Sequence, residues 1–354
     1  MKMSSYQFIV VSLVVLIAQC VSAKYVCSEV TFKNTLVTII ESDRTHRKTV
    51  TGCISDETLL LKNLKTILVQ GQQIPTLYKG AVSNIPHFFG LKIENNSIAT
   101  VKRWAFLNLG AHSISLNNNG IEWLNEGSFE NLPSLETIDL EYNEIRVLPK
   151  DAFVNLHNLS MVSFGHNYLE AFDQNWFNDT PNLEYIFLHN NQLKSISKDA
   201  FSKFGNLKAA TFENNWIEYV DRDAFRGVSK LGELYLGNNR IRHLDLDWSD
   251  VHSLRFMGVD DNQLTYIPLS TLKPFEDSLQ HFWIHANPWQ CSCFDQIGEW
   301  ATVHNVKLWW RCKKIDLFCY VPQKNSAVCQ NRTDTELDSN FLQYSVHDCA
   351  KVTT

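Results

Sequence analysis

The sequence predicts an α/β solenoid of about ten short turns, with a parallel β-sheet along one side and disulfide-bonded ends. Two columns of residues that recur about every 24 positions predict the stacked turns. Cysteines that gather near the two ends of the chain predict the disulfides. Hydrophobic residues make up 44% of the chain and charged residues 20%, which allows a large core and argues against global disorder.

Residues 1–23 have the pattern of a secretory signal peptide. Lys2 gives a positive start, an apolar run covers residues 8–18, and Val21-Ser22-Ala23 supplies the small residues of a cleavage site. A membrane anchor is the less favoured alternative, because the run is short for about 30 Å of hydrocarbon. A lipoprotein modified at Cys20 is a second alternative that we rank lower still. We therefore expect a secreted, extracellular product with no membrane span.

Residues 24–60 are predicted to form an N-terminal cap. They contain two cysteines, Cys27 and Cys53, and the next cysteine in the chain is Cys291. A solenoid exposes an apolar surface at each open end, so a capping element is needed there.

Residues 61–286 repeat one frame of apolar and variable positions that ends in an asparagine and one more apolar residue, as over residues 135–145. The asparagines recur at spacings of 23 to 25 residues, and Gln72 holds the same place in one earlier unit. These asparagines are Asn96, Asn119, Asn143, Asn167, Asn191, Asn215, Asn239, Asn262 and Asn287. A phenylalanine column has nearly the same period and consists of Phe106, Phe129, Phe153, Phe177, Phe201 and Phe225.

Both columns have a structural interpretation. Alternating apolar residues in each unit predict a short strand with one buried face, and stacked strands would form the parallel sheet. A side-chain amide donates and accepts, so the asparagines can bridge the turns that follow the strands. Each bridge would remove a desolvation penalty of about 1–3 kcal/mol per buried group. The phenylalanines would fill the core between the sheet and the outer wall.

These columns resemble those of the leucine-rich repeat family, in its extracellular form with repeats of about 24 residues, over approximately residues 61–290. The resemblance implies a curved horseshoe with the parallel sheet on its concave face. It also implies cysteine caps at both ends, with Cys27 and Cys53 holding a disulfide-bonded hairpin over the first turn. Secreted leucine-rich immune proteins of insects are similar in this respect.

Residues 287–354 resemble the family's C-terminal cap. Asn287-Pro288-Trp289-Gln290-Cys291-Ser292-Cys293 matches the opening of that cap, and Gly298-Glu299-Trp300 matches its helix. The family's pairing favours three bonds among the fifteen arrangements that six cysteines allow. These bonds are Cys291–Cys319, Cys293–Cys349 and Cys312–Cys329. A zinc site is the disfavoured alternative, because paired Cys-x-x-Cys motifs are lacking, and we expect neither metal nor cofactor.

The strand residues between the apolar positions should project from the concave face. Acidic residues there greatly outnumber the one base, Lys92, and aromatic residues gather in the later units. Exposed aromatic residues on a rigid sheet suit a protein-binding surface, although an ordinary exposed surface is the alternative. The candidate partner-binding residues are Asp139, Glu141, Tyr142, Tyr185, Phe187, His189, Glu213, Glu233, Tyr235, Phe256, Asp260 and Trp283. His189 and Glu213 occupy one column in adjacent turns, so we expect them to pair.

Four sequons mark candidate glycosylation sites, namely Asn95, Asn158, Asn178 and Asn331. Asn158 and Asn331 are the better candidates, because Pro181 closely follows the sequon of Asn178 and Asn95 lies beside the asparagine column.

The sequence favours binding over catalysis. It lacks Gly-x-Ser-x-Gly, His-Glu-x-x-His and a glycine-rich phosphate loop, so we expect no enzyme activity. The net charge of −6, without a long basic block, argues against nucleic acid. We expect a basic or neutral protein or glycan partner, in innate immunity or alternatively in the extracellular matrix or in development. An even number of cysteines after the signal segment, with no heptads behind the cap, predicts a monomer or a non-covalent dimer.

Overall fold

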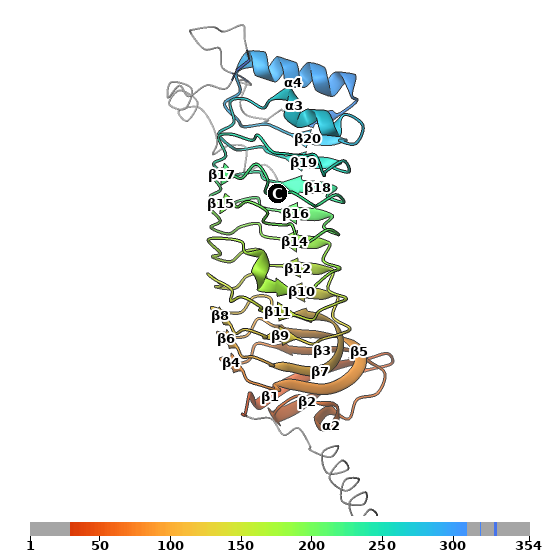
Figure 1. Cartoon of the computed structure of the whole chain (residues 1–354). Helices are drawn as coiled ribbons and strands as arrows, with labels where there is room; N and C mark the ends of the chain where they lie inside the picture. Colours follow the sequence, from red (N-terminus) through yellow and green to blue (C-terminus); the bar gives the residue numbers. More distant parts are fainter. Residues whose placement is uncertain (1–28, 310–318, 320–328, 331–354) are drawn as a thin grey trace, which may run out of the picture.

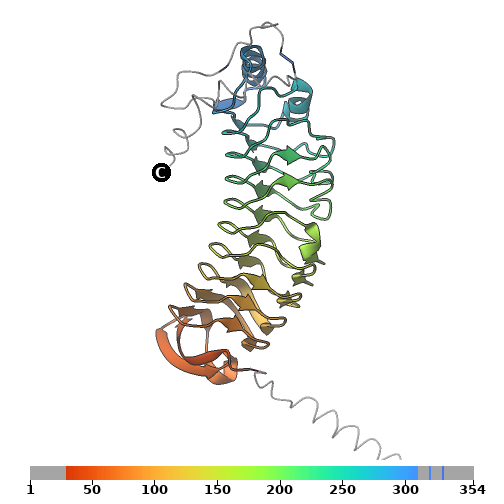
Figure 2. The same cartoon turned by 90° about the vertical axis from the view of Figure 1, so that its left-hand side faces the viewer.

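The protein is an elongated rod of stacked turns (Figures 1 and 2). A computed structural model describes residues 29–309, 319, 329 and 330. The signal segment, Cys27, Cys312, Cys349 and Asn331 lie outside the described residues, so the predicted signal peptide, the bond between Cys27 and Cys53 and the glycosylation of Asn331 stay predictions.

The N-terminal end is an antiparallel hairpin of β1 (Phe32–Glu41) and β2 (Thr45–Gly52), followed by the short helix α2 (Asp56–Leu59). Strand β1 also pairs antiparallel with β3 (Leu64–Gln70), the first strand of the repeats. The hairpin thus covers the open end of the stack, as the sequence predicts. Cys53 is disulfide-bonded.

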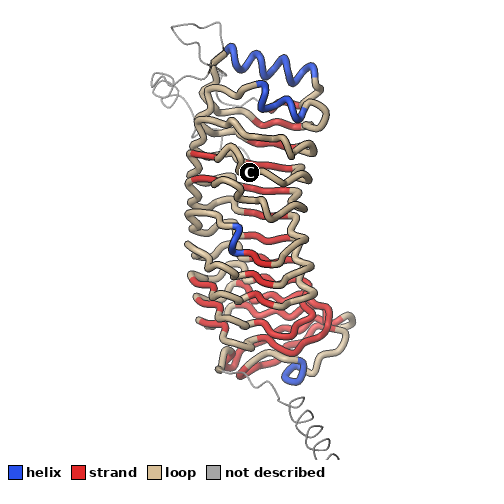
Figure 3. The backbone as a smooth tube through the Cα atoms, in the orientation of Figure 1, coloured by secondary structure: helices blue, strands red, loops and turns tan. Residues whose placement is uncertain are grey.

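One sheet runs the length of the rod (Figure 3). From β3 onward its neighbouring strands are parallel, because each turn brings the chain back in the same direction. Its strands after β3 are β5 (Val82–Glu94), β7 (Phe106–Ser115), β10 (Thr137–Asp139), β12 (Met161–Ser163), β14 (Tyr185–Phe187), β16 (Ala209–Thr211), β18 (Glu233–Tyr235), β19 (Phe256–Gly258), β20 (His281–Trp283) and β21 (Lys307–Trp309). The predicted stack of about ten turns is confirmed, and β21 adds a strand that the repeat frame does not predict.

Shorter elements form the other sides of the turns. One small sheet consists of β4 (Thr76–Leu77), β6 (Thr100–Val101) and β8 (Trp123–Leu124), and a second of β9 (Phe129–Glu130), β11 (Phe153–Val154) and β13 (Phe177–Asn178). A third consists of β15 (Ser195–Ile196) and β17 (Tyr219–Val220). Single helical turns are η1 (Gln174–Trp176), α3 (Leu269–Leu272) and η2 (Lys273–Phe275).

The asparagine column bridges successive turns as predicted. In Asn191, the side-chain amide donates to the carbonyl oxygen of Phe164 in the previous turn at 2.9 Å, while its oxygen accepts from the backbone N–H of Leu169 at 2.9 Å. Gln72 differs, because its amide donates only within its own turn, to the carbonyl oxygen of Gln70 at 3.0 Å. The first turn has no earlier repeat to bridge, which explains the exception.

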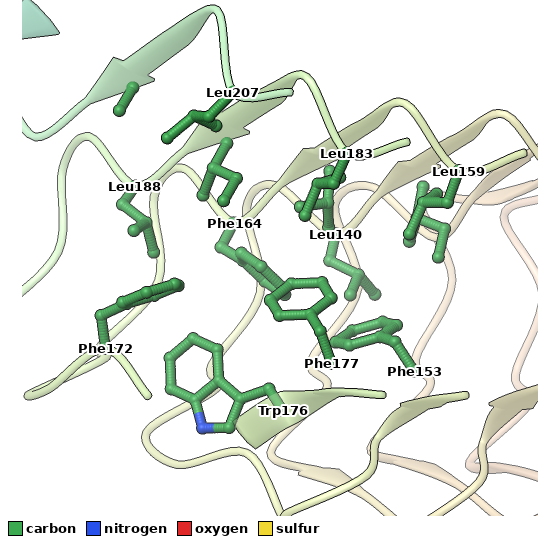
Figure 4. Packing of buried hydrophobic residues seen from close by; sticks show 14 of the residues in the cluster. Leu140, Phe153, Leu159, Phe164, Phe172, Trp176, Phe177, Leu183, Leu188 and Leu207 are labelled. Carbon is green, nitrogen blue, oxygen red and sulfur yellow. The ribbon is translucent and has the colours of Figure 1, made fainter. Parts of the chain in front are cut away.

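The phenylalanine column fills the core, also as predicted. Phe153 is fully buried, and its ring centroid lies 5.5 Å from that of Phe129 and 5.0 Å from that of Phe177. Figure 4 shows the rings of Phe153 and Phe177 packed with Phe164 and Trp176 between the leucines of the sheet and the outer wall. Consecutive rings therefore stabilise the contact between turns as well as the core of each turn.

The C-terminal end carries helix α4 (Cys291–Val303), which confirms the predicted cap helix. Cys291 bonds to Cys319, as predicted, but Cys293 bonds to Cys329. The predicted pairs Cys293–Cys349 and Cys312–Cys329 are therefore wrong. The side-chain amide of Gln290 donates to the carbonyl oxygen of Gln330 at 2.6 Å, and this contact holds the chain beside Cys329 against the start of the helix.

Candidate partner-binding face

The outward side of the long sheet, here called the sheet face, presents the predicted residues in straight columns. Thr137 pairs with Met161, and Met161 with Tyr185, along what we call the third column. On the same three strands, Asp139, Ser163 and Phe187 follow one another along what we call the fifth column. This register is fixed because the alternate positions of every strand are buried in the core.

Aromatic rings form a continuous layer over β18 to β21, here called the aromatic layer. Its members are Tyr235, Phe256, His281, Trp283 and Trp309. The rings of Trp283 and Trp309 are nearly parallel, with an interplanar angle of 5° and centroids 6.1 Å apart. Phe256 lies 5.3 Å from His281, and Tyr235 lies 6.0 Å from Trp283. Gly258 separates Tyr235 from Trp283 in the fifth column and so leaves room for their contact.

Two members of this layer, His281 and Trp309, were absent from the predicted site. Trp309 lies on β21 and donates its ring N–H to Nδ1 of His281 at 3.1 Å, while the ammonium of Lys307 lies 4.1 Å from its ring centroid. No repeat frame marks residues 307–309, since the cap helix separates them from the last asparagine. The only sequence signal was the short apolar pattern after the helix.

Tyr185 and Phe187 lie apart from the aromatic layer. Their ring centroids are 6.4 Å apart on β14, and the small residues Ala209 and Thr211 occupy the same columns on the next strand. The predicted aromatic residues therefore divide into one pair and one layer. Glu233 accepts a hydrogen bond from the Tyr235 hydroxyl at 3.4 Å, and burial together with this carboxylate raises the pKa of Tyr235 to about 12.

A row of ionisable side chains follows the strands in the position that we call the seventh column. Glu141, Gly165 and His189 follow one another there, and the imidazole Nε2 of His189 lies 4.0 Å from a Glu141 oxygen. A side-chain carbon on Gly165 would lie 2.5 Å from the imidazole, so the glycine makes this contact across two turns feasible. The predicted pairing of His189 with Glu213 is therefore wrong. Burial lowers the pKa of His189, which favours the neutral imidazole.

A second contact across a glycine lies three turns further along the column. The Asp260 carboxylate extends over Gly237 toward Glu213, and a side-chain carbon on Gly237 would lie 3.0 Å from that carboxylate. Desolvation, with a smaller contribution from Asp260, raises the pKa of Glu213 to about 7. Burial also raises the pKa of Asp260, although its carboxylate lies 3.5 Å from the imidazole of His285.

The residue before each column asparagine has a left-handed backbone conformation. Asparagine, aspartate or alanine occupies seven of these places, at Asn95, Asn118, Asn190, Asn214, Asn238, Asp261 and Ala286. The two exceptions are Tyr142 and His166, with φ of 53° and 55°, and their rings stack with centroids 4.0 Å apart. Tyr142 is 49% exposed. A bulky residue in this conformation is uncommon and strained.

The repeat pattern agrees with a comparison against protein families. A family model described as the BspA type leucine-rich repeat region, in six copies, matches residues 76–193 and 125–245. The fold is a leucine-rich repeat solenoid. A comparison with curated proteins gave no match.

The lateral side of this leucine-rich repeat solenoid contrasts with the sheet face. Three positions after the six column asparagines from Asn119 to Asn239, the charge alternates in sign from turn to turn, through Glu122, Arg146, Glu170, Lys194, Glu218 and Arg242. Lys194 binds Glu170 at 2.6 Å, and Glu218 lies 3.7 Å from the guanidinium of Arg240. These charges neutralise one another within the protein, whereas Glu141, Glu213 and Asp260 on the sheet face form no ion pair with a lysine or arginine among the described residues.

The predicted glycosylation sites differ in their surroundings. The amide of Asn158 donates to the carbonyl oxygen of Pro133 at 2.7 Å, and Asn182 and Asn206 make equivalent contacts one and two turns later. Asn158 thus contributes to turn stacking. Asn95 and Asn178 are exposed, and glycosylation at all these positions stays a prediction.

The part of the chain that the structure describes lacks two other kinds of feature. Among these residues, no three His, Cys, Asp or Glu side chains gather as ligands for a metal ion. No helix in the same range is both long and apolar enough to cross a lipid bilayer.

Proposed function

We propose that this chain is a secreted recognition protein whose sheet face binds an extracellular protein partner. Leucine-rich repeats suggest a protein-binding scaffold. The observation that carries the proposal is the aromatic layer, because burial of the core does not require rings on the outward side of β18 to β21. Large rigid rings supply contact area at low cost in conformational entropy, and such residues dominate binding energy in protein interfaces. The role is binding, with no chemical reaction.

Two biological settings suit this mechanism. In the first, the partner is part of an innate immune response, as the likeness to secreted insect immune proteins suggests. In the second, the partner belongs to the extracellular matrix or to a developmental signal. A glycan partner is the alternative class of ligand, since aromatic rings with flanking carboxylates also suit sugars. We favour protein because the layer is continuous over four strands.

Affinity capture identifies the partner. The tagged full-length protein is incubated with extracellular fluid collected with and without immune challenge, and bound proteins are identified by mass spectrometry. A partner recovered mainly after challenge would support the immune setting, while equal recovery would support the matrix or developmental one. A glycan partner would be revealed by loss of capture after enzymatic deglycosylation of the fluid.

Surface plasmon resonance then tests the face. Replacing Tyr235 and Trp283 together by alanine should weaken binding of the captured partner at least tenfold, because two central rings are lost. The matched control replaces Trp123 and Tyr219, which are 57% and 59% exposed on the short strands β8 and β17, away from the sheet face. Unchanged affinity in the first variant, or an equal loss in the control, would place the site elsewhere. Circular dichroism checks that both variants fold.

A further inference from the structure

Three of the acids in the seventh column lack a lysine or arginine partner. Glu141, Glu213 and Asp260 are half-buried, and none of them forms an ion pair with a lysine or arginine in the described part of the chain, whereas Glu94 of the same column lies 3.7 Å from the ammonium of Lys92. On the lateral side, by contrast, acids and bases alternate and pair. A desolvated carboxylate without a nearby cation is unfavourable in free energy, so a basic partner would supply the positive charge that the fold does not provide.

The geometry of the column suits an extended ligand. Glu141 and Glu213 are three turns apart, which corresponds to about 14 Å at the strand spacing, and the Asp260 carboxylate lies over Gly237, one turn or about 5 Å from Glu213. An extended peptide advances about 3.3 Å per residue and points alternate side chains to opposite faces, so basic side chains four and two residues apart would share one face and meet the three acids. Tyr142 and Tyr235 lie beside the column and offer ring faces for cations.

We propose that the seventh column receives the lysine or arginine side chains of an extended basic segment of the protein partner, and that acidification releases this segment. The inference rests on the proposed function, because it names the partner chemistry of the same face. The release follows from the groups that surround each acid. Glu213 faces Asp260 and Tyr235, Glu141 faces His189, and Asp260 faces His285.

The direction of the pH effect follows from these neighbours. Burial and Asp260 raise the pKa of Glu213 to about 7, so a fall in pH from 7.5 to 5.5 removes most of its negative charge. His189 gains positive charge as the pH falls further, although burial lowers its pKa and so delays this change. Both changes repel a basic segment. If only the ionised form of Glu213 binds, this group alone would weaken binding by about 20-fold over that range.

A synthetic peptide of about twelve residues is the probe, with arginines at relative positions 1, 5 and 7 among glycines and serines, so that all three side chains lie on one face of the extended peptide. Its control replaces each arginine by uncharged citrulline. Isothermal titration calorimetry with the full-length protein, in two buffers of different ionisation enthalpy, measures affinity and proton release together. We expect binding of the arginine peptide at pH 7.5 with release of protons, binding at least tenfold weaker at pH 5.5, and little binding of the citrulline peptide.

Two matched variants locate the effect. Glu213→Gln should weaken binding of the arginine peptide at pH 7.5 and reduce both the proton release and the pH dependence. Glu218→Gln, which removes an exposed acid paired with Arg240 on the lateral side, should leave all three unchanged. Equal effects of the two variants, binding that does not depend on pH, or equal affinity for the citrulline peptide would overturn the inference.

The outcome is separable from that of the proposed function. If the Tyr235 and Trp283 variant loses the captured partner while the arginine peptide fails to bind the wild-type protein, the sheet face is the site and the basic segment is wrong. If the captured partner binds that variant normally, the proposed function itself fails.

Discussion

Removing one column asparagine from the middle of the stack should reduce stability far more than removing the glutamine of the first turn. Asn167 is only 4% exposed. Its amide donates to the carbonyl oxygens of Leu140 at 2.9 Å and Phe164 at 3.0 Å, and more weakly to that of Gly165 at 3.2 Å. Its side-chain oxygen accepts from the backbone N–H of Ile145 at 3.0 Å.

The loss of stability expected for Asn167→Ala depends on which hydrogen bonds the partners of Asn167 keep. The three carbonyls retain other donors, namely the side-chain amides of Asn143 and Asn191 and the backbone N–H of Tyr142. The N–H of Ile145 lies in the core and keeps no acceptor. One buried unpaired donor costs about 1–3 kcal/mol, and the weakened carbonyls add about 1 kcal/mol, so the free energy of unfolding should fall by about 3 kcal/mol. Gln72→Ala, which removes a contact within one turn, should cost less than about 0.5 kcal/mol.

Urea denaturation followed by circular dichroism measures both changes. Because a stack of repeats can open locally, hydrogen exchange at the N–H of Ile145 should be measured as well, and it should become faster in Asn167→Ala alone. A loss below about 1 kcal/mol, or one equal to that of Gln72→Ala, would show that the asparagine column does not hold the turns together.

Three further predictions concern the core, the strained turn and the buried acid. Phe153→Ala should cost about 3–5 kcal/mol in urea denaturation, because it opens a cavity between stacked rings, whereas Phe88→Ala should cost little since that ring is 65% exposed. Tyr142→Asn should raise the free energy of unfolding by about 1 kcal/mol, since asparagine tolerates the left-handed conformation, and a decrease would contradict the assignment of strain. Folding raises the pKa of Glu213 from 4.5 to about 7, so its charge destabilises the fold above pH 7 and has no such effect below pH 4.5. Glu213→Gln should therefore stabilise the protein by on the order of 1–2 kcal/mol at pH 8 and hardly at pH 4.5, and a gain of equal size at both values would be inconsistent with this origin.

The sequence was sufficient for the stack and for the columns of the sheet face. A period of about 24 residues determines which side chains lie in register, so Met161 and Tyr185 could be placed side by side from spacing alone. The sequence was not sufficient for β21, because its pairing with β20 depends on where the cap helix returns the chain. Nor did it give the bond between Cys293 and Cys329, which depends on how the chain near residue 330 contacts Gln290.

The sequence predicted which residues belong to a column better than it predicted which residues of a column contact one another. We expected His189 to pair with its nearest acid, Glu213, but the missing side chain of Gly165 lets the imidazole reach Glu141 instead. The sequence already shows that the residue between Glu141 and His189 in the seventh column is a glycine, which has no side chain. Its effect depends on side-chain direction, which spacing does not determine.

The strained turns support the interpretation that the sheet face is shaped for binding. At most of these places the residue tolerates a left-handed backbone, as Asn118 and Asn190 do on either side. Tyr142 does not, whereas histidine at the next place is enriched in this conformation, and the stacked rings of Tyr142 and His166 lie beside the contact of Glu141 with His189. The ring contact offsets part of the strain at Tyr142, but asparagine in that place would avoid it altogether. A half-exposed tyrosine in such a position is therefore better explained by contact with a partner than by stability of the fold.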